Sequence, residues 1–111
     1  MYTTPVKTAL LLAVLLKRSG KTRARASEKT IKLLSGRVRL RGAFIVEVIA
    51  RLEDFGVMAV EADRGGFSLI SIPALEGAPP ITAKAFLSDF RQLSEEDLFA
   101  ELGLHADSGD E

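Results

Sequence analysis

Positively charged side chains are concentrated in one stretch of this sequence. Between Lys17 and Arg41 there are ten lysines and arginines and one acid. Ammonium and guanidinium groups gathered in this way are the groups that neutralise nucleic-acid phosphates. The candidate DNA-binding residues are Lys21, Arg23, Arg25, Lys29, Lys32, Arg37, Arg39, Arg41 and Arg64. The alternative is that several of these arginines pair with carboxylates of the same chain.

The two halves of the chain carry opposite charge. The net charge is zero, yet residues 1–51 hold 12 basic and 2 acidic side chains, and residues 52–111 hold 3 basic and 13 acidic ones. The balances are therefore +10 and −10. Such asymmetry indicates either a surface that faces a polyanion or pairing within the molecule.

Residues able to catalyse a reaction or to bind a metal ion are scarce. His105 is the only histidine, and the chain has no cysteine. No second ligand stands at metal-binding spacing from His105. Gly65-Gly66 lacks the downstream lysine of a phosphate-binding loop and is typical of a turn. We expect no enzymatic activity, no cofactor and no metal site, and the sequence identifies no small-molecule substrate.

Two helices are predicted on either side of the arginine-rich connection. Ser27 can cap a helix over residues 28–34, which Gly36 can end. A longer helix spans residues 42–55 and stops at Gly56. The buried face predicted for it by 100° spacing consists of Phe44, Ile45, Val48, Ile49, Leu52 and Phe55.

Strand signals flank and follow the two helices. Two apolar runs, 57–60 and 67–72, are joined by Asp63-Arg64-Gly65-Gly66, which is a strong hairpin signal. Residues 21–26 alternate basic and small side chains, which indicates an extended segment with both arginines on one side.

The first helix is predicted to begin with Thr4 as cap and Pro5 in the first helical position. Residues 6–17 are apolar almost all round, so we expect this helix to be covered on most sides, as a core helix or as part of a dimer interface. The longest apolar run, residues 9–16, is far shorter than the roughly 20 residues that cross a bilayer. With no signal-peptide pattern and no cysteine, a cytoplasmic protein is expected.

A composition change divides the chain into a domain over residues 1–75 and an extension over residues 76–111. The extension opens with a proline-containing linker, for which an extended, stiff conformation is expected. A helix is predicted over residues 83–90, and residues 94–97 resemble a capping box that opens a short helix ending near Leu102.

Residues 4–72 resemble the winged-helix superfamily, specifically the small prokaryotic winged helix-turn-helix proteins. The resemblance is carried by residues 27–36, by the helix end Leu52-Glu53-Asp54-Phe55-Gly56 and by the turn at residues 63–66. It implies an α+β, mainly α fold of three helices and a β-hairpin wing with a C-terminal helical extension. It also implies that a short strand near residues 21–26 pairs with the hairpin, and that double-stranded DNA is the partner of a transcriptional regulator or accessory factor.

By the same resemblance, the helix over residues 42–55 lies in the major groove, and Arg64 approaches the DNA backbone or minor groove. A major-groove reader normally presents Arg, Lys, Asn or Gln to base edges. The outward face here consists of Ala43, Val46, Glu47, Ala50, Glu53 and Asp54. We therefore expect DNA contact mainly from the start of this helix, near Arg37 to Arg41, and from the basic extended segment.

Two further hypotheses remain open at this stage. The chain can be a protein-interaction or dimerisation module, with a homodimer built from the first helix and the apolar residues of the extension. Alternatively, residues 76–111, which carry nine acids and two basic residues, can cover the basic surface as a DNA mimic.

Overall fold

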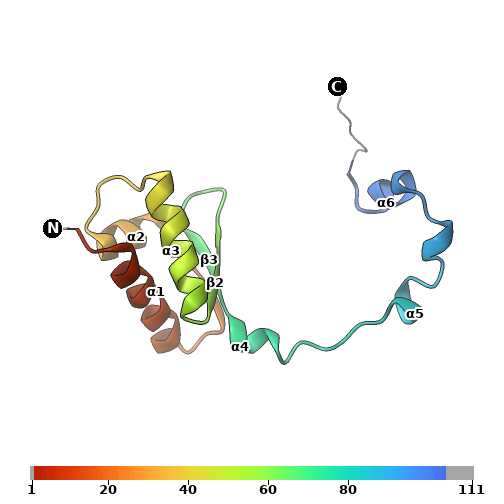
Figure 1. The fold of residues 1–111 in the computed structure, drawn as a ribbon, viewed down its shortest axis with the longest axis horizontal. Helices are drawn as coiled ribbons and strands as arrows, with labels where there is room; N and C mark the ends of the chain where they lie inside the picture. The colour runs from red at the N-terminus through yellow and green to blue at the C-terminus, as the bar shows by residue number, and fades with distance from the viewer. Residues whose placement is uncertain (1, 105–111) are drawn as a thin grey trace, which may run out of the picture. The chain divides into compact units, whose positions relative to one another are not determined.

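The structure is a computed structural model that describes residues 2–104, and these residues form an α+β fold (Figure 1). Its elements are α1 (Pro5–Ser19), β1 (Arg23–Ala26), α2 (Glu28–Ser35), α3 (Gly42–Asp54), β2 (Val57–Glu61), β3 (Phe67–Ser71), α4 (Ile72–Leu75), α5 (Ala83–Phe86), a 3-10 turn (Phe90–Gln92) and α6 (Glu95–Glu101). The predicted α+β class is confirmed. The chain divides into two units, Met1–Ala78 and Pro79–Glu111.

Helices of the first unit begin and end where capping residues place them. The Thr4 hydroxyl accepts a hydrogen bond from the Lys7 N–H at 3.1 Å, and the Ser27 hydroxyl accepts one from the Thr30 N–H at 3.2 Å. Gly36 ends α2 with a left-handed φ of 69°, which glycine adopts without steric cost. These helix starts, predicted from the sequence, are confirmed.

The first unit contains a three-stranded antiparallel sheet in the order β1-β3-β2. β1 pairs with β3 from Arg23 opposite Ile70 to Ala26 opposite Phe67, and β2 pairs with the other side of β3. The extended segment predicted near residues 21–26 is thus confirmed for β1. Its pairing with the hairpin follows the arrangement that the family resemblance implied.

The core of the first unit lies between the inner face of the sheet and the helices. Leu12 of α1, Val48 and Leu52 of α3, Ile31 of α2 and Phe67 of β3 are fully buried or nearly so. Burial of each large side chain contributes about 1.5–3 kcal/mol, offset by the entropy lost on ordering. The sheet and α3 are therefore held in one rigid packing unit.

Most of the buried face predicted for α3 is confirmed. Phe44, Ile45, Val48 and Leu52 are buried, and Ile49 packs against them. The prediction for Phe55 is wrong, because its side chain is 38% exposed. Phe55 is the C-cap of α3 with non-helical backbone angles, so its side chain leaves the helical stripe as the chain turns towards β2.

Within the first unit α1 is covered on one side only, so the core-helix alternative is wrong, while the dimer-interface alternative stays a prediction. One side of α1 is buried through Thr8, Ala9, Leu12 and Leu16. The other side exposes Val6, Leu10, Val14 and Leu15, each between 40% and 44%. An almost uniformly apolar helix does not reveal which side its neighbours cover, because every position gives the same hydrophobic signal.

The second unit consists of short helices with exposed apolar side chains. α5 ends at Phe86, four residues before the predicted end, because Leu87 adopts φ −141° and ψ 38°. The capping box predicted at the start of α6 is confirmed: Ser94 and Asp97 exchange two hydrogen bonds.

The short helix α4, which belongs to the first unit, was not predicted. Within the described part of the chain, no helix combines the length and apolar character needed to cross a membrane.

Candidate nucleic-acid interface

The connection between α2 and α3 and the turn of the β2–β3 hairpin lie at the same end of the first unit, where α3 begins (Figure 1). Arg41 is the N-cap residue of α3 and makes no side-chain capping hydrogen bond. The first backbone N–H groups of α3 therefore lack a side-chain acceptor at the cap position. Together with the helix dipole, they give this end of α3 a partial positive charge.

Two arginines of the α2–α3 connection are exposed, and the third, Arg37, is partly buried. Arg39 and Arg41 are exposed. The guanidinium of Arg37 instead lies over the ring of Phe44 at 3.9 Å and over the ring of Tyr2 at 4.9 Å. Its Nη2 also donates a hydrogen bond to the Thr3 carbonyl oxygen at 3.3 Å. Arg37 therefore fastens the connection to the N-terminal segment, while its neighbours remain available to a ligand.

The hairpin turn carries Arg64 beside the end of β1. Arg64 and Arg25 line the same hollow of about 570 Å³, together with the carboxylates Glu28 and Asp63. Among the described residues of the first unit, neither arginine has a carboxylate oxygen within salt-bridge distance. The hollow therefore mixes both signs of charge, and both of its arginines are exposed, Arg64 in the turn of the hairpin.

Helix α2 presents two lysines, which differ in their pairing. Lys29 is exposed. The Nζ of Lys32 lies 3.8 Å from Glu28 Oε2, one helical turn away. Both partners are about half exposed, so this ion pair contributes little and releases Lys32 easily to a stronger anion.

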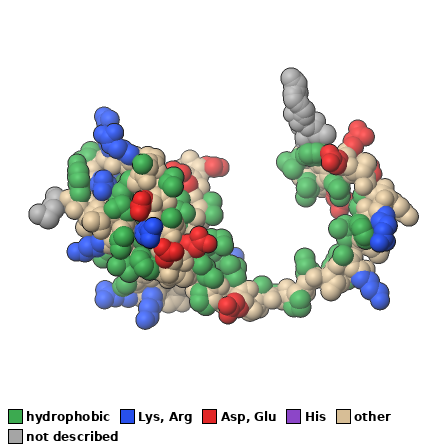
Figure 2. All heavy atoms as spheres, viewed as in Figure 1, with side chains coloured by type: hydrophobic (Ala, Val, Ile, Leu, Met, Phe, Trp, Pro, Cys, Tyr) green, Lys and Arg blue, Asp and Glu red, His purple; other side chains and the backbone are tan. Residues whose placement is uncertain are grey.

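The remaining candidate residues lie elsewhere on the first unit. Arg23 and Arg25 project from the outer face of the sheet, which is the face away from α1 and α3. Lys21 lines a separate hollow with Lys17 and Phe55, near the C-terminal end of α3. Figure 2 accordingly shows blue side chains on several sides of the first unit. The candidate residues are therefore distributed over several parts of the first unit.

The outward face of α3 is acidic. Arg51, the cation in its last turn, lies 3.5 Å from a carboxylate oxygen of Glu47 and 3.1 Å from one of Asp54. Glu53 on the same helix is exposed as well. Phosphates would be repelled from the middle of this helix, so an anion is favoured only at its start.

Sequence reasoning missed two features of the first unit. One is Tyr2, which contacts Arg37 and whose position relative to Arg37 no local pattern reveals. The other is the apolar outer face of the sheet, formed by Met58, Val60 and Ile70. The sequence did contain a signal for the apolar outer face. The runs at 57–60 and 67–72 have apolar side chains at both odd and even positions, and successive side chains of a strand point to opposite faces of the sheet.

Metal-binding geometry is absent from residues 2–104: these residues contain no group of three or more potential ligands that could hold a metal ion. His105, the residue considered for such a role, lies outside the described residues. Asp97 is the one described group with a shifted pKa, which is lowered from its usual 3.8. Hydrogen bonds from the Ser94 backbone and side chain are the causes, so the shift reflects helix capping.

The end of the first unit where α3 begins has the chemistry of an anion-binding surface. Its exposed donors are the guanidinium groups of Arg39, Arg41 and Arg64 and the ammonium group of Lys29. Guanidinium and ammonium groups are donors that suit phosphate oxygens. No protein-family model, curated protein or solved structure matches the chain.

Proposed function

We propose that this protein binds double-stranded DNA as a winged helix-turn-helix protein, in the role of a transcriptional regulator or accessory DNA-binding factor. The order α1-β1-α2-α3-β2-β3 supports the winged-helix interpretation, because it places a helix-turn-helix before a hairpin. The antiparallel pairing of β1 with the hairpin supports it as well.

The observation that carries the proposal is the unpaired state of the cations. Among the nine candidate residues, the described part of the first unit provides a carboxylate partner only for Lys32. Cations that are neither paired nor buried release counterions when phosphates bind, and this release supplies most of the sequence-independent affinity for DNA. The alternative that these arginines mainly neutralise the domain's own acids therefore loses its main support.

DNA would be bound chiefly through its phosphates. Arg39 and Arg41 would hold one strand at the start of α3, where the helix dipole adds to their charge. Arg64 at the hairpin tip would contact the backbone or the minor groove. Because Glu47, Glu53 and Asp54 line the rest of α3, its C-terminal half would remain outside the groove.

Fluorescence anisotropy with a labelled duplex of random sequence tests this proposal. The full-length protein should bind at low salt, and the Arg39→Ala/Arg41→Ala variant should bind about tenfold or more weakly. The matched control is Lys17→Ala/Arg18→Ala, which removes two cations from the last turn of α1. Equal affinity of the Arg39→Ala/Arg41→Ala variant and the unchanged protein would refute DNA binding through this end of the unit.

A further inference from the structure

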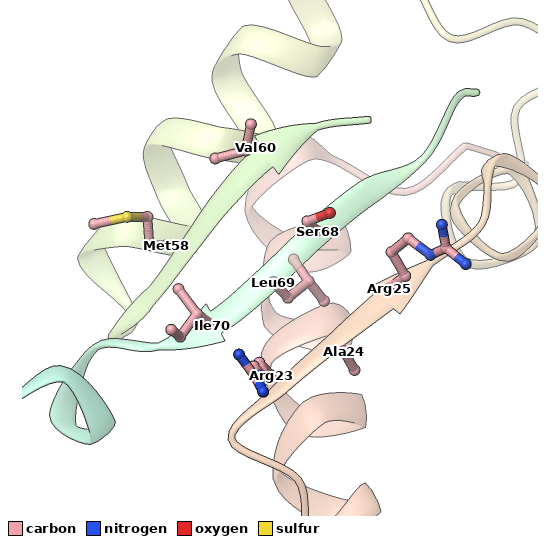
Figure 3. A pocket seen from close by; sticks show the side chains of 8 residues that line it. All are labelled: Arg23, Ala24, Arg25, Met58, Val60, Ser68, Leu69 and Ile70. Atoms are coloured by element: carbon pink, nitrogen blue, oxygen red, sulfur yellow. The ribbon is translucent and has the colours of Figure 1, made fainter. Parts of the chain in front are cut away.

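The outer face of the sheet combines an apolar centre with two arginines (Figure 3). One cross-strand row contains Arg23, Ile70 and Met58, and the next contains Arg25, Ser68 and Val60. Met58 is 44% exposed and Val60 is 60% exposed. Within the first unit, the helices cover only the opposite face of the sheet, so this apolar surface faces solvent.

The surface is hollowed and carries no acid. A shallow groove of about 400 Å³ lies across the three strands, and both arginines line it. None of its lining residues is Asp or Glu. The matching ligand is therefore an apolar segment that also presents carboxylates, because it would bury the methyl groups and pair with the two arginines.

Helix α6 of the second unit has this chemistry. At 100° per residue, Leu98, Phe99 and Leu102 share one stripe, with Glu95 inside that arc and Glu101 beside it. Leu98 is 41% exposed and Leu102 is 72% exposed. Neither Glu95 nor Glu101 forms an ion pair within the described residues of the second unit.

The spacing of the charged groups also agrees. Glu95 and Glu101 are six residues apart on α6, which is about 9 Å at 1.5 Å per residue. Arg23 and Arg25 are two residues apart on β1, which is about 7 Å at 3.4 Å per residue. A helix that lies along β1 can therefore bring one glutamate near each arginine, with its leucines over the apolar centre of the sheet.

We propose that the outer sheet face binds α6 of a second copy of this chain, so that two copies form a reciprocal dimer. Pro79 and Pro80, at the start of the second unit, favour an extended and stiff chain, which opposes folding of α6 back onto the sheet of its own copy. A two-fold arrangement repeats each contact, and the second contact forms at high effective concentration once the first has formed. This inference does not need the DNA contacts proposed for Arg39, Arg41 and Arg64, although Arg23 and Arg25 are also among the nine candidate residues.

Sedimentation equilibrium of the full-length chain tests the dimer. The expected mass is twice the 12.0 kDa of one chain, and a single 12.0 kDa species at every soluble concentration would overturn the proposal. The variants Arg23→Glu/Arg25→Glu and Glu95→Arg/Glu101→Arg should each be monomeric, since like charges then face one another. A dimer in either variant would contradict the assigned contact. The matched control Lys17→Glu/Arg18→Glu should remain dimeric.

Mixing the two monomeric variants gives the decisive result. In the mixture, the sheet that carries Arg23→Glu/Arg25→Glu can bind the α6 that carries Glu95→Arg/Glu101→Arg, because their charges are again opposite. The unchanged sheet of the second variant can bind the unchanged α6 of the first. A heterodimer of about twice the monomer mass should therefore form, which also shows that both variants are folded. A mixture that stays monomeric would overturn exchange between copies.

Discussion

The guanidinium of Arg37 lies 3.9 Å from the centre of the Phe44 ring, and its Nη2 donates to the carbonyl oxygen of Thr3. This arrangement joins the α2–α3 connection to the first turn of α3 and to the N-terminal segment. Thr3 is itself tied to α2, because its backbone N–H donates to the Ser35 carbonyl oxygen at 2.9 Å. Arg37 thereby stabilises the conformation that presents Arg39 and Arg41.

Replacing Arg37 by alanine should lower the free energy of unfolding by about 1–2 kcal/mol, because both the ring stacking and a charged hydrogen bond are lost. Arg37→Lys should recover little, since an ammonium group cannot stack as a planar guanidinium does. The matched control Arg39→Ala should change stability by less than about 0.5 kcal/mol. Urea denaturation followed by circular dichroism measures all three, and equal effects of Arg37→Ala and Arg39→Ala would contradict the assignment.

Gly66 should tolerate no side chain. Its φ is +82°, and a Cβ built there would lie 2.2 Å from the backbone carbonyl oxygen of Ala26. Gly66→Ala should therefore cost about 3 kcal/mol or more, because β1 or the hairpin must move in addition to the left-handed strain.

Gly20 provides the comparison, since its φ is +75° and no atom lies within 4 Å of the corresponding Cβ. Gly20→Ala should cost only the left-handed strain of about 1–2 kcal/mol. The melting temperatures of the two variants separate the steric clash at Gly66 from the left-handed backbone strain that both variants share. If Gly66→Ala were no more destabilising than Gly20→Ala, the close approach of the hairpin to β1 would be incorrect.

Local features of the fold were predictable because their causes are local. Ser27 and Ser94 cap helices through residues three positions away, and the alternation at Arg23 and Arg25 fixes which side chains share one side of a strand. The end of α5 was not predictable in this way. A short helix needs packing to persist, and Phe86 finds none within the second unit, where it is 77% exposed.

The candidate site was predictable in composition and not in arrangement. Charge counting identified the cations, but it could not separate Arg37 from Arg39, because the partners Tyr2 and Phe44 are 35 and 7 residues away in the chain. It also could not show that Lys21 and Arg64 line different hollows of the first unit. Both distinctions depend on tertiary packing, which the spacing of charges does not encode.

The capping box of α6 should make the start of this helix sensitive to acid. Asp97 Oδ2 accepts a hydrogen bond from the Ser94 N–H at 3.0 Å, and this bond lowers the pKa of Asp97 below 3.8. A carboxyl whose folded-state pKa is lowered contributes stability above its unfolded pKa and loses that contribution as the pH falls through the lowered value. The helix should therefore be intact near neutral pH and should begin to fray only below about pH 4.

Carboxyl carbon shifts in an NMR titration measure this pKa directly. Ser94→Ala keeps the backbone donor and removes the Ser94 side-chain hydroxyl, whose hydrogen bond also lowers the pKa of Asp97, so it should raise that pKa part of the way to its usual value. The Cα shifts of Glu95 to Leu98 should report loss of helix over the same pH range. An Asp97 pKa at or above 3.8 in the unchanged protein would disprove the capping interaction.

DNA affinity should depend steeply on salt concentration. If about five of the exposed cations neutralise phosphates, the logarithm of the binding constant should fall with the logarithm of salt at a slope near −4.5. Arg39→Ala/Arg41→Ala should reduce the magnitude of that slope by about 1.8, since each lost phosphate contact removes about 0.9. Lys17→Ala/Arg18→Ala removes the same charge from the last turn of α1 and should leave the slope unchanged. Equal changes in both variants would show that affinity follows total charge and not the groups at the start of α3.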